Sequence, residues 1–287
     1  MTTNEVEIRS AFFCCRKILP TERRTEMIEG MLNRVHHSDC LEGLRRLPDE
    51  SIDVIVTSPP YWKGFEYEAY FNSYKQYLDW CEKWLKECKR VLKPTGTFYL
   101  NVINDSEITI RAFELMEIAT RKVMFKLHDT IVWYRYNQQP ANTPRQLTNQ
   151  CEYIFMLRHT SANIDLHKTE AYERNPHIFE TKNVGNVWRI PFNSGKKCVS
   201  GFGRKETKSK FGHSGFPLEL PETCILLSSN KGDIVLDMFM GSGTTAVACV
   251  NTDRYYIGFD MSREYCEIAQ KRLDEAIATK REQGDGS

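Results

Sequence analysis

The chain is organised around residues 52–62, which read IDVIVTSPPYW. The first half of this stretch is rich in β-branched residues, as expected for a strand that is buried on both faces of a parallel sheet. Pro59 and Pro60 then end the strand, because proline has a fixed φ and cannot donate a hydrogen bond to a neighbouring strand. The stretch therefore predicts a rigid corner at the carboxyl end of a strand, where open α/β sheets bind their ligands.

The chemical groups of this corner suit a planar ligand that carries an amine. The carbonyl of Pro59 and the hydroxyl of Ser58 can accept hydrogen bonds, and the rings of Tyr61 and Trp62 offer flat faces for stacking. Pro60 is expected only to hold the corner rigid. A Pro-Pro turn with two packed aromatic rings would have the same sequence, so a second motif is needed to choose between a binding site and a turn.

The second motif has the layout of a nucleotide-cofactor site. Residues 233–237 predict a strand, and residues 238–245, MFMGSGTT, predict a glycine turn that opens a helix. Glycine lets a ligand approach the backbone closely, and the amides of a helix N-terminus can bind a carboxylate or phosphate. The next predicted strand, residues 255–259, is followed by Asp260, whose carboxylate can accept hydrogen bonds from both hydroxyls of a ribose. Because dinucleotide sites also permit Ala246 in place of a third glycine, the turn alone does not identify the cofactor.

The other predicted elements alternate between helices and strands. Helices are expected at residues 41–47, 74–92, 107–123, 218–228 and 263–280, and strands at 34–37, 97–102, 127–134 and 152–157. This alternation predicts an α/β fold with a doubly wound, mostly parallel sheet. The strands at 127–134 and 152–157 are expected to pair antiparallel at one edge of the sheet.

Length and composition limit the classes of protein that the chain can belong to. A chain of 287 residues can hold one large core with an insert. Its ten cysteines include no C-x-x-C pair, so they are expected to be reduced thiols rather than disulfides or zinc ligands. No apolar stretch is long enough to span a membrane, and residues 1–10 lack a signal-peptide core. The sequence thus predicts a cytoplasmic protein without a metal site.

Two polar segments are candidates for contact with nucleic acid, although the net charge of the chain is only +1. Residues 135–150 contain Arg135 and Arg145, no acidic residue and several Asn and Gln side chains, which can read base edges. Residues 194–212 carry one acidic residue and six basic ones, which are Lys196, Lys197, Arg204, Lys205, Lys208 and Lys210. This stretch suits the phosphate backbone of DNA, but a solvated loop would have the same composition.

With both motifs in view, the chain resembles the amino-methylating DNA methyltransferases. These enzymes move a methyl group from S-adenosylmethionine to the exocyclic amine of cytosine or adenine. The tetrapeptide at 58–61, SPPY, looks like their catalytic motif, and residues 237–245, DMFMGSGTT, look like their cofactor motif. The catalytic motif comes first, which is the permuted order of the group called β. The resemblance covers residues 33–280 and implies a methyltransferase fold that binds S-adenosylmethionine and double-stranded DNA.

The resemblance also implies roles for single residues. Asp39 matches an acid that contacts the adenine of the cofactor, and it is also expected to cap the helix that follows. Phe216 and Pro217 match a segment that covers the methionine end of the cofactor, and Asp260 matches the ribose ligand. The cofactor motif supplies Asp237, Phe239, Gly241, Ser242, Gly243 and Thr244. In the catalytic motif, Tyr61 is expected to stack on a base that has been flipped out of the duplex.

The implied organisation has four parts. They are an N-terminal extension at residues 1–30, a catalytic half at 31–158, a target-recognition insert at 159–212 and a cofactor-binding half at 213–287. Residues 186–191, NVWRIP, are also similar to the family, but no role follows from that likeness. The resemblance leaves open whether a cognate restriction endonuclease is a partner, and whether the chain acts as a monomer or a homodimer.

The first residue of the catalytic motif bears on the identity of the base. Serine favours N4 of cytosine, because aspartate is commoner in the adenine enzymes, and N6 of adenine is the alternative. The chain has no Pro-Cys pair, which the carbon-5 methylating enzymes use for a covalent step. Two interpretations from other classes are a nicotinamide-dependent oxidoreductase that uses the glycine turn and a catalytically silent DNA-binding subunit. The two intact motifs argue against the silent subunit.

Overall fold

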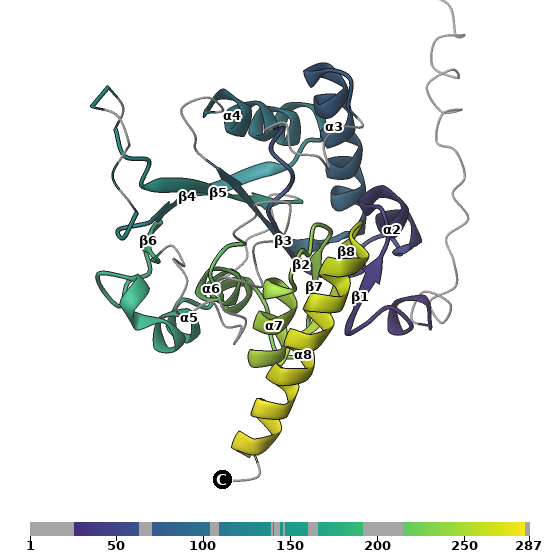
Figure 1. Cartoon of the computed structure of the whole chain (residues 1–287), viewed down its shortest axis with the longest axis vertical. Helices are drawn as coiled ribbons and strands as arrows, with labels where there is room; N and C mark the ends of the chain where they lie inside the picture. The colour runs from purple at the N-terminus through teal and green to yellow at the C-terminus, as the bar shows by residue number, and fades with distance from the viewer. Residues whose placement is uncertain are drawn as a thin grey trace, which may run out of the picture.

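The computed structural model describes residues 26–62, 71–103, 109–138, 140, 144–145, 147–159, 166–191 and 215–284. Within these ranges the strands form one sheet of eight strands in the order β1-β8-β7-β2-β3-β5-β4-β6 (Figure 1). The strands are β1 Arg34–His37, β2 Ile52–Thr57, β3 Leu92–Ile103, β4 Lys126–Tyr134, β5 Cys151–Arg158, β6 Val187–Arg189, β7 Ile234–Asp237 and β8 Tyr255–Asp260.

Helices cover both faces of the sheet and give the doubly wound α/β fold that the sequence predicts (Figure 1). The helices on one face are α2 Cys40–Arg46, α3 Tyr74–Val91 and α4 Thr109–Glu117, which continues into the π-helical turn η2 Ile118–Lys122. The elements on the other face are α5 Lys168–Arg174, the 3-10 turn η3 Pro176–Ile178, α6 Glu219–Ser228, α7 Thr244–Asn251 and α8 Arg263–Gly284.

Strand β2 lies in the middle of the sheet and pairs in parallel with β3 on one side and β7 on the other. Its apolar side chains are buried on both faces, since Ile55 belongs to the core under α2 and α3, whereas Val54 and Val56 belong to the core under α6 and α7. This confirms the prediction from the β-branched run. The carboxyl end of β2 therefore lies in the middle of the row of strand ends, between β3 and β7.

The antiparallel part of the sheet also follows the prediction. Strands β4 and β5 pair antiparallel, and β5 pairs antiparallel with β3. One strand was not expected: β6 pairs in parallel with β4 and extends the sheet beyond the hairpin. The run of three residues is too short to show a strand period in the sequence.

Part of the expected target-recognition insert belongs to the main core. Ile178, Trp188 and Ile190 are at most 1% exposed and pack with the residues of α6 and α7. The indole of Trp133 in β4 donates a hydrogen bond to the carbonyl of Ile190 at 2.8 Å. Residues 166–191 are therefore integral to the fold, rather than part of a separate insert that begins at residue 159.

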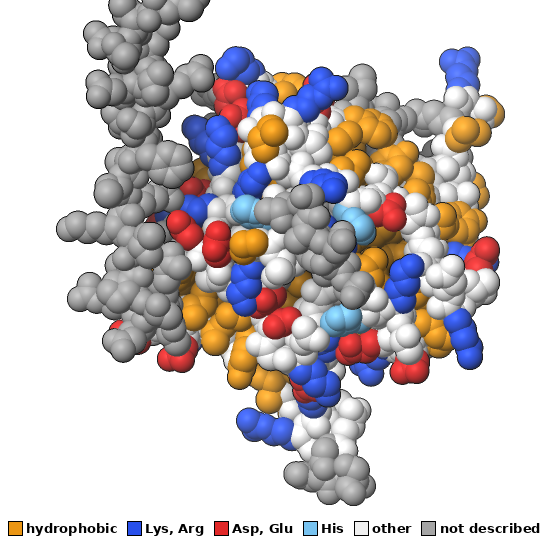
Figure 2. All heavy atoms as spheres, turned by 180° about the vertical axis from the view of Figure 1, so that it is seen from behind, with side chains coloured by type: hydrophobic (Ala, Val, Ile, Leu, Met, Phe, Trp, Pro, Cys, Tyr) orange, Lys and Arg blue, Asp and Glu red, His pale blue; other side chains and the backbone are white. Residues whose placement is uncertain are grey.

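The surface shows no broad basic field on the face in Figure 2, as far as the described residues are concerned. Lys and Arg side chains are interspersed there with Asp and Glu side chains. The six basic residues predicted to contact the DNA backbone between residues 194 and 212 lie outside the described residues. In the described part of the chain, no helix is both long and apolar enough to cross a membrane.

Candidate active site

The carboxyl ends of parallel strands bring the two sequence motifs to one edge of the sheet (Figure 1). Strands β2 and β7 are neighbours, as are β7 and β8, and each pair is parallel. The corner at residues 58–62 follows β2, and the glycine turn at residues 238–243 follows β7. Asp260 is the last residue of β8. The topology therefore joins groups that are far apart in the sequence.

Asp237 connects the corner to the glycine turn. Its Oδ1 accepts hydrogen bonds from the Thr57 hydroxyl at 2.6 Å and from the Phe239 amide at 3.0 Å. Its Oδ2 accepts one from the Thr245 hydroxyl at 2.6 Å. Burial raises the pKa of Asp237 to about 6, against the opposing effect of these donors. The sequence places Asp237 among the cofactor residues, but in the structure its carboxylate binds protein donors from β2, the turn and α7.

Two glycines give the turn its shape. Gly241 has φ of +53° and Gly243 has φ of +85°, both in the left-handed region that residues with a side chain rarely adopt. A Cβ atom on Gly243 would also lie 2.8 Å from the Cβ atom of Ala269 in α8. Glycine is thus required at position 243 both for the backbone conformation and for the close approach of α8. Thr244 begins α7, so the turn leads directly into a helix N-terminus.

Arg272 in α8 binds the glycine turn and is not among the residues that the sequence predicts for the cofactor site. One guanidinium nitrogen, Nη1, donates to the Ser242 carbonyl at 2.6 Å, to the Ser242 hydroxyl at 2.7 Å and to the Thr244 hydroxyl at 3.2 Å. Arg272 is only 6% exposed. A sequence signal exists, because Arg272 falls on the buried stripe of α8 between Ala269 and Leu273, where a charged residue is unusual.

Asp260 is hydrogen-bonded to the glycine turn, and its carboxylate can still accept hydrogen bonds from a ligand. Its Oδ2 accepts from the Gly241 amide at 2.8 Å and its Oδ1 from the Ser262 amide at 2.8 Å. Each carboxylate oxygen has a second lone pair. Burial raises the pKa of Asp260, and the two amide donors partly offset this rise. The geometry is compatible with the expected role as a ribose ligand.

Asp39 follows β1, next to the end of β8. The parallel pairing of β1 and β8 places His37 opposite Asp260, and the Ser38 amide donates to the Asp260 carbonyl at 2.9 Å. Asp39 Oδ1 accepts from the amides of Leu41 at 2.9 Å and Glu42 at 3.2 Å, which confirms the predicted helix cap. Among the described residues, none donates a hydrogen bond to Asp39 Oδ2. One oxygen is thus left for a ligand.

The segment with Phe216 and Pro217 lies near the start of α7. Phe216 packs against the core on that face of the sheet. The nearest side-chain atom to a Cβ built on the preceding residue, Gly215, is the Thr244 hydroxyl oxygen at 3.9 Å. The segment is thus close to the glycine turn, as a cofactor-covering segment would need to be.

The corner itself is held by side chains from α3 and α4. The Tyr77 hydroxyl donates to the Pro60 carbonyl at 2.7 Å. Arg111 Nη1 donates to the Tyr61 carbonyl at 3.1 Å and also to the Trp62 carbonyl. Among the described residues, none donates a hydrogen bond to the Pro59 carbonyl. The carbonyl that the sequence predicts as an acceptor for an amine therefore receives no hydrogen bond from the described part of the chain.

The hydroxyls of Ser58 and Tyr61 are hydrogen-bonded to each other. The Tyr61 hydroxyl also donates to the Asn101 carbonyl in β3 at 3.4 Å. Burial, together with the nearby charge of Glu152, raises the pKa of Tyr61, so its hydroxyl stays protonated. The hydroxyl of Ser58 has two lone pairs and can accept a further hydrogen bond.

The two arginines expected to contact DNA differ in their positions. Arg145 is exposed at the β4–β5 connection. Arg135 is 5% exposed, and its guanidinium pairs with the Glu152 carboxylate at 2.9 Å and donates to the Asn149 carbonyl at 3.0 Å. The expectation that Arg135 reaches DNA is therefore corrected: it holds the base of the loop. Glu152 also accepts a hydrogen bond from the Asn101 side chain at 3.2 Å.

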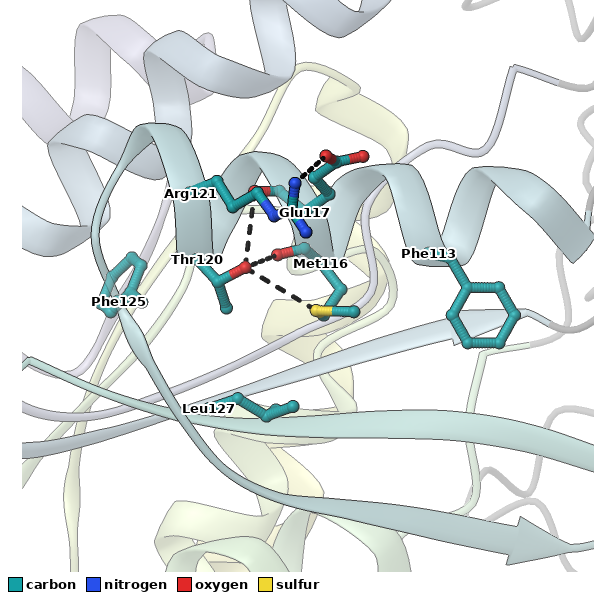
Figure 3. Close-up of a pocket in the computed structure, with 7 residues that line it drawn as sticks. All are labelled: Phe113, Met116, Glu117, Thr120, Arg121, Phe125 and Leu127. Carbon is teal, nitrogen blue, oxygen red and sulfur yellow. Dashed lines mark hydrogen bonds and ion pairs between the residues drawn. The ribbon is translucent and has the colours of Figure 1, made fainter.

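A separate pocket of about 540 Å³ lies between the α4–η2 helix and β4 (Figure 3). Its lining residues are Phe113, Met116, Glu117, Thr120, Arg121, Phe125 and Leu127. None of them belongs to either sequence motif. The candidate active site is therefore the strand-end edge described above, not this pocket.

Comparison with known proteins identifies the family of this chain. The N6/N4 methyltransferase family, described as DNA methylase, matches residues 52–271, from β2 into α8. The type II methyltransferase M.HinfI of Haemophilus influenzae is 31% identical over 267 residues, covering 87% of this chain and 70% of the relative. The DNA adenine methyltransferase YhdJ of Escherichia coli strain K12 is 30% identical over 258 residues, covering 84% and 82%.

Solved structures have the same fold. PvuII DNA methyltransferase, which is cytosine-N4-specific, has a TM-score of 0.67 at 22% identity, covering 83% of this chain and 85% of that chain. The Thermus thermophilus protein TTHA0409, complexed with S-adenosyl-L-methionine, has a TM-score of 0.60 at 25% identity, covering 85% and 94%. The family match spans most of the chain and includes both motifs, so this chain belongs to the N6/N4 family of DNA methylases.

Proposed function

We propose that this chain transfers a methyl group from S-adenosylmethionine to N4 of a cytosine that has been flipped out of double-stranded DNA. The observation that carries the proposal is the Pro59 carbonyl, to which no described residue donates a hydrogen bond, in the same corner as Tyr61 and on the edge of the sheet that also holds the glycine turn. Family membership supports the methyl transfer and the DNA substrate. The choice of cytosine N4 rests on Ser58.

The residues at the strand ends fit S-adenosylmethionine. Asp260 would accept hydrogen bonds from the ribose, and Asp39 would bind near the adenine through its unused oxygen. Gly241 and Gly243 place no side chain between their backbone and a ligand, and Arg272 binds the turn at Ser242. When bound, the cofactor supplies an electrophilic methyl group on its sulfonium. The TTHA0409 complex, at 25% identity, supports the same cofactor.

The chain's own residues activate the amine. The exocyclic amine of a base is a poor nucleophile, because its lone pair is delocalised into the ring. A hydrogen bond from this amine to the Pro59 carbonyl would favour a pyramidal nitrogen with a localised lone pair. Ser58 can accept a second hydrogen bond, and stacking on Tyr61 would hold the base in place. Such positioning can lower a barrier by up to about 7–11 kcal/mol.

The base is extruded at a cost of a few kcal/mol, since the amine is unreachable inside a duplex. The exposed Arg145 at the β4–β5 connection and the basic residues of 194–212 are the proposed contacts to DNA. Relatives named as type II methyltransferases support a role in restriction and modification. A chain that methylates the DNA of its own bacterial cell would act in the cytoplasm.

Methylation of N6 of adenine is the second candidate, because the relative YhdJ, at 30% identity, is an adenine methyltransferase. Methylation-sensitive sequencing of DNA from cells that express this chain would separate the two bases and give the recognition site. We expect N4-methylcytosine at one short sequence. N6-methyladenine there would support the second candidate, and unmethylated DNA would contradict both.

A further inference from the structure

Trp62, directly after the corner, has an unusual backbone conformation. Its φ is +55°, in the left-handed region, where bulky residues are rare because the side chain crowds the backbone. Such a conformation is strained and persists only where the surrounding structure enforces it. The contacts around Trp62 should therefore reveal what holds the corner in shape.

Arg111 in α4 makes the hydrogen bonds that enforce it. Its Nη1 donates to the carbonyls of both Tyr61 and Trp62, the two residues on either side of the peptide bond that leads into the left-handed conformation. The guanidinium carbon lies 5.2 Å from the centre of the Tyr74 ring. The Tyr74 hydroxyl in turn donates to Glu114, one turn further along α4. Arg111 is thus fixed from two helices.

Aromatic packing also holds Trp62 in place. The rings of Trp62 and Tyr77 are stacked, with centres 6.0 Å apart and planes 29° apart. The Tyr77 hydroxyl holds the Pro60 carbonyl. The carbonyls of residues 60, 61 and 62 are therefore all bound by side chains of α3 and α4, whereas no described residue binds the carbonyl just before them, on Pro59.

We propose that Arg111 is a positioning residue for methyl transfer. This inference rests on the proposed function, because it concerns how the corner presents the Pro59 carbonyl and the Tyr61 ring. Arg111 does not need to touch the base. By holding the carbonyls of Tyr61 and Trp62, it keeps Trp62 in its left-handed conformation and thereby fixes the direction of the backbone on which both catalytic groups stand. Without it, Trp62 would relax to negative φ and the corner would turn.

Two variants and a matched control test the proposal. Arg111→Met keeps much of the side-chain length but removes both hydrogen bonds, and Arg111→Lys keeps a cation that can bind one carbonyl. The control is Arg121→Met in η2, where the arginine is exposed and pairs at 3.3 Å with Glu117. Single-turnover methylation is measured with saturating S-adenosylmethionine and DNA, and cofactor affinity is measured by calorimetry.

We expect Arg111→Met to lower the single-turnover rate by about 10- to 100-fold, as displacements of roughly 1 Å do in oriented sites. Arg111→Lys should recover part of the loss. Cofactor affinity should stay within about twofold of wild type, because the glycine turn is held by Arg272 and not by Arg111. If Arg111 only stabilised the fold, folded Arg111→Met protein would methylate at the wild-type rate. A lower rate with unchanged cofactor affinity therefore indicates a positioning role.

A crystal structure of Arg111→Met gives a readout that does not depend on activity. The proposal expects Trp62 at negative φ in the variant and at positive φ in the Arg121→Met control. Trp62 remaining left-handed without Arg111, or single-turnover rates equal to those of the control, would overturn it. If Arg111→Met does not fold, the single-turnover rate of Arg111→Lys decides: a rate below that of the Arg121→Met control supports the proposal, and a rate equal to it overturns the proposal. A wild-type chain that methylates no amine contradicts the proposed function instead. In that case the φ of Trp62 still tests whether Arg111 holds the corner in shape.

Discussion

Tyr61 is the residue whose side chain would meet the target base most directly. Its hydroxyl is bonded to Ser58 and to the Asn101 carbonyl, so the orientation of its ring is fixed before any base arrives. An oriented ring loses little conformational entropy when a base stacks on it. The hydroxyl would position the ring, and the ring face would bind the base.

Tyr61→Ala should therefore lower single-turnover methylation by about one to two orders of magnitude, because base–aromatic stacking is worth about 1–3 kcal/mol. Tyr61→Phe keeps the ring face and should retain most of the activity. Ser58→Ala keeps the ring but removes one acceptor, so it should slow the chemical step more than it weakens DNA binding. Equal damage from Phe and Ala at position 61 would show that the hydroxyl matters and that stacking is the wrong account.

Asp237 makes the clearest link between pH and stability. Burial raises its pKa from the ordinary 3.8 to about 6. The folded protein then holds this proton more tightly than the unfolded chain does, so the contribution of Asp237 to stability is largest below about pH 4 and declines as the pH rises through about 6. The hydrogen bonds of this carboxylate join β2, β7 and α7, whereas its ionisation lowers the stability of the fold.

Asp237→Asn tests this, since the amide oxygen can replace Oδ1 and the Thr245 hydroxyl can turn to accept from the amide nitrogen. As the pH rises from about 4 to about 7, the free energy of unfolding of the variant should increase by on the order of 2–3 kcal/mol relative to that of wild type. Urea denaturation of both proteins at the two pH values measures it. A difference that does not change with pH would mean an ordinary pKa for Asp237.

At the scale of elements, the β4–β5 hairpin links the expected DNA loop to the catalytic corner. The Arg135–Glu152 pair is buried at the base of that loop, and Glu152 also binds Asn101, whose carbonyl accepts from Tyr61. A buried pair of this kind fixes a geometry, because either charge left alone in the interior is costly.

Arg135→Met should consequently destabilise the protein by about 3–5 kcal/mol, whereas Arg145→Met should change stability by less than about 0.5 kcal/mol. The effects on DNA binding should be reversed, with Arg145→Met lowering the salt dependence of affinity and Arg135→Met leaving its slope unchanged. Thermal unfolding and DNA titrations at several salt concentrations measure both. An Arg135→Met protein of wild-type stability would contradict the structural role.

Helices, strands and caps that depend on neighbouring residues could be predicted from the sequence. The β-branched run gave β2, the apolar stripe gave α3 to within one residue, and Asp39 was predicted as a cap from its place before a helix. The missed features are tertiary. Strand β6 is held by pairing with β4 and by the burial of Trp188 in the core of that face, and Arg111 and Arg272 acquire their roles only when distant segments meet. For β6 and Arg111, nothing in the neighbouring residues marks the role.

For the whole molecule, the parallel strands explain why two motifs far apart in the chain can form one site. The strand ends hold the groups proposed for the cofactor and the base, whereas the groups proposed for the DNA backbone lie in segments 135–150 and 194–212. The net charge of +1 makes such local patches necessary, because there is no general attraction of the protein for DNA.

Replacing Lys196, Lys197, Lys205 and Lys208 by alanine should flatten the dependence of DNA affinity on salt. The slope should fall by about 0.9 for each phosphate group that the protein no longer neutralises. Cofactor binding should be unaffected, because these lysines belong neither to the cofactor motif nor to the catalytic motif. An unchanged slope would identify this stretch as an ordinary solvated loop.

In the proposed reaction an exocyclic amine, N4 of cytosine, receives the methyl group. Its most direct test is mass spectrometry of nucleosides from DNA that has been incubated with the purified chain and S-adenosylmethionine with a deuterated methyl group. Labelled N4-methylcytosine is expected, with about 10- to 100-fold less label at short incubation times when Tyr61 is replaced by alanine. Label in N6-methyladenine would contradict the choice of base, and label in 5-methylcytosine would contradict transfer to an amine altogether.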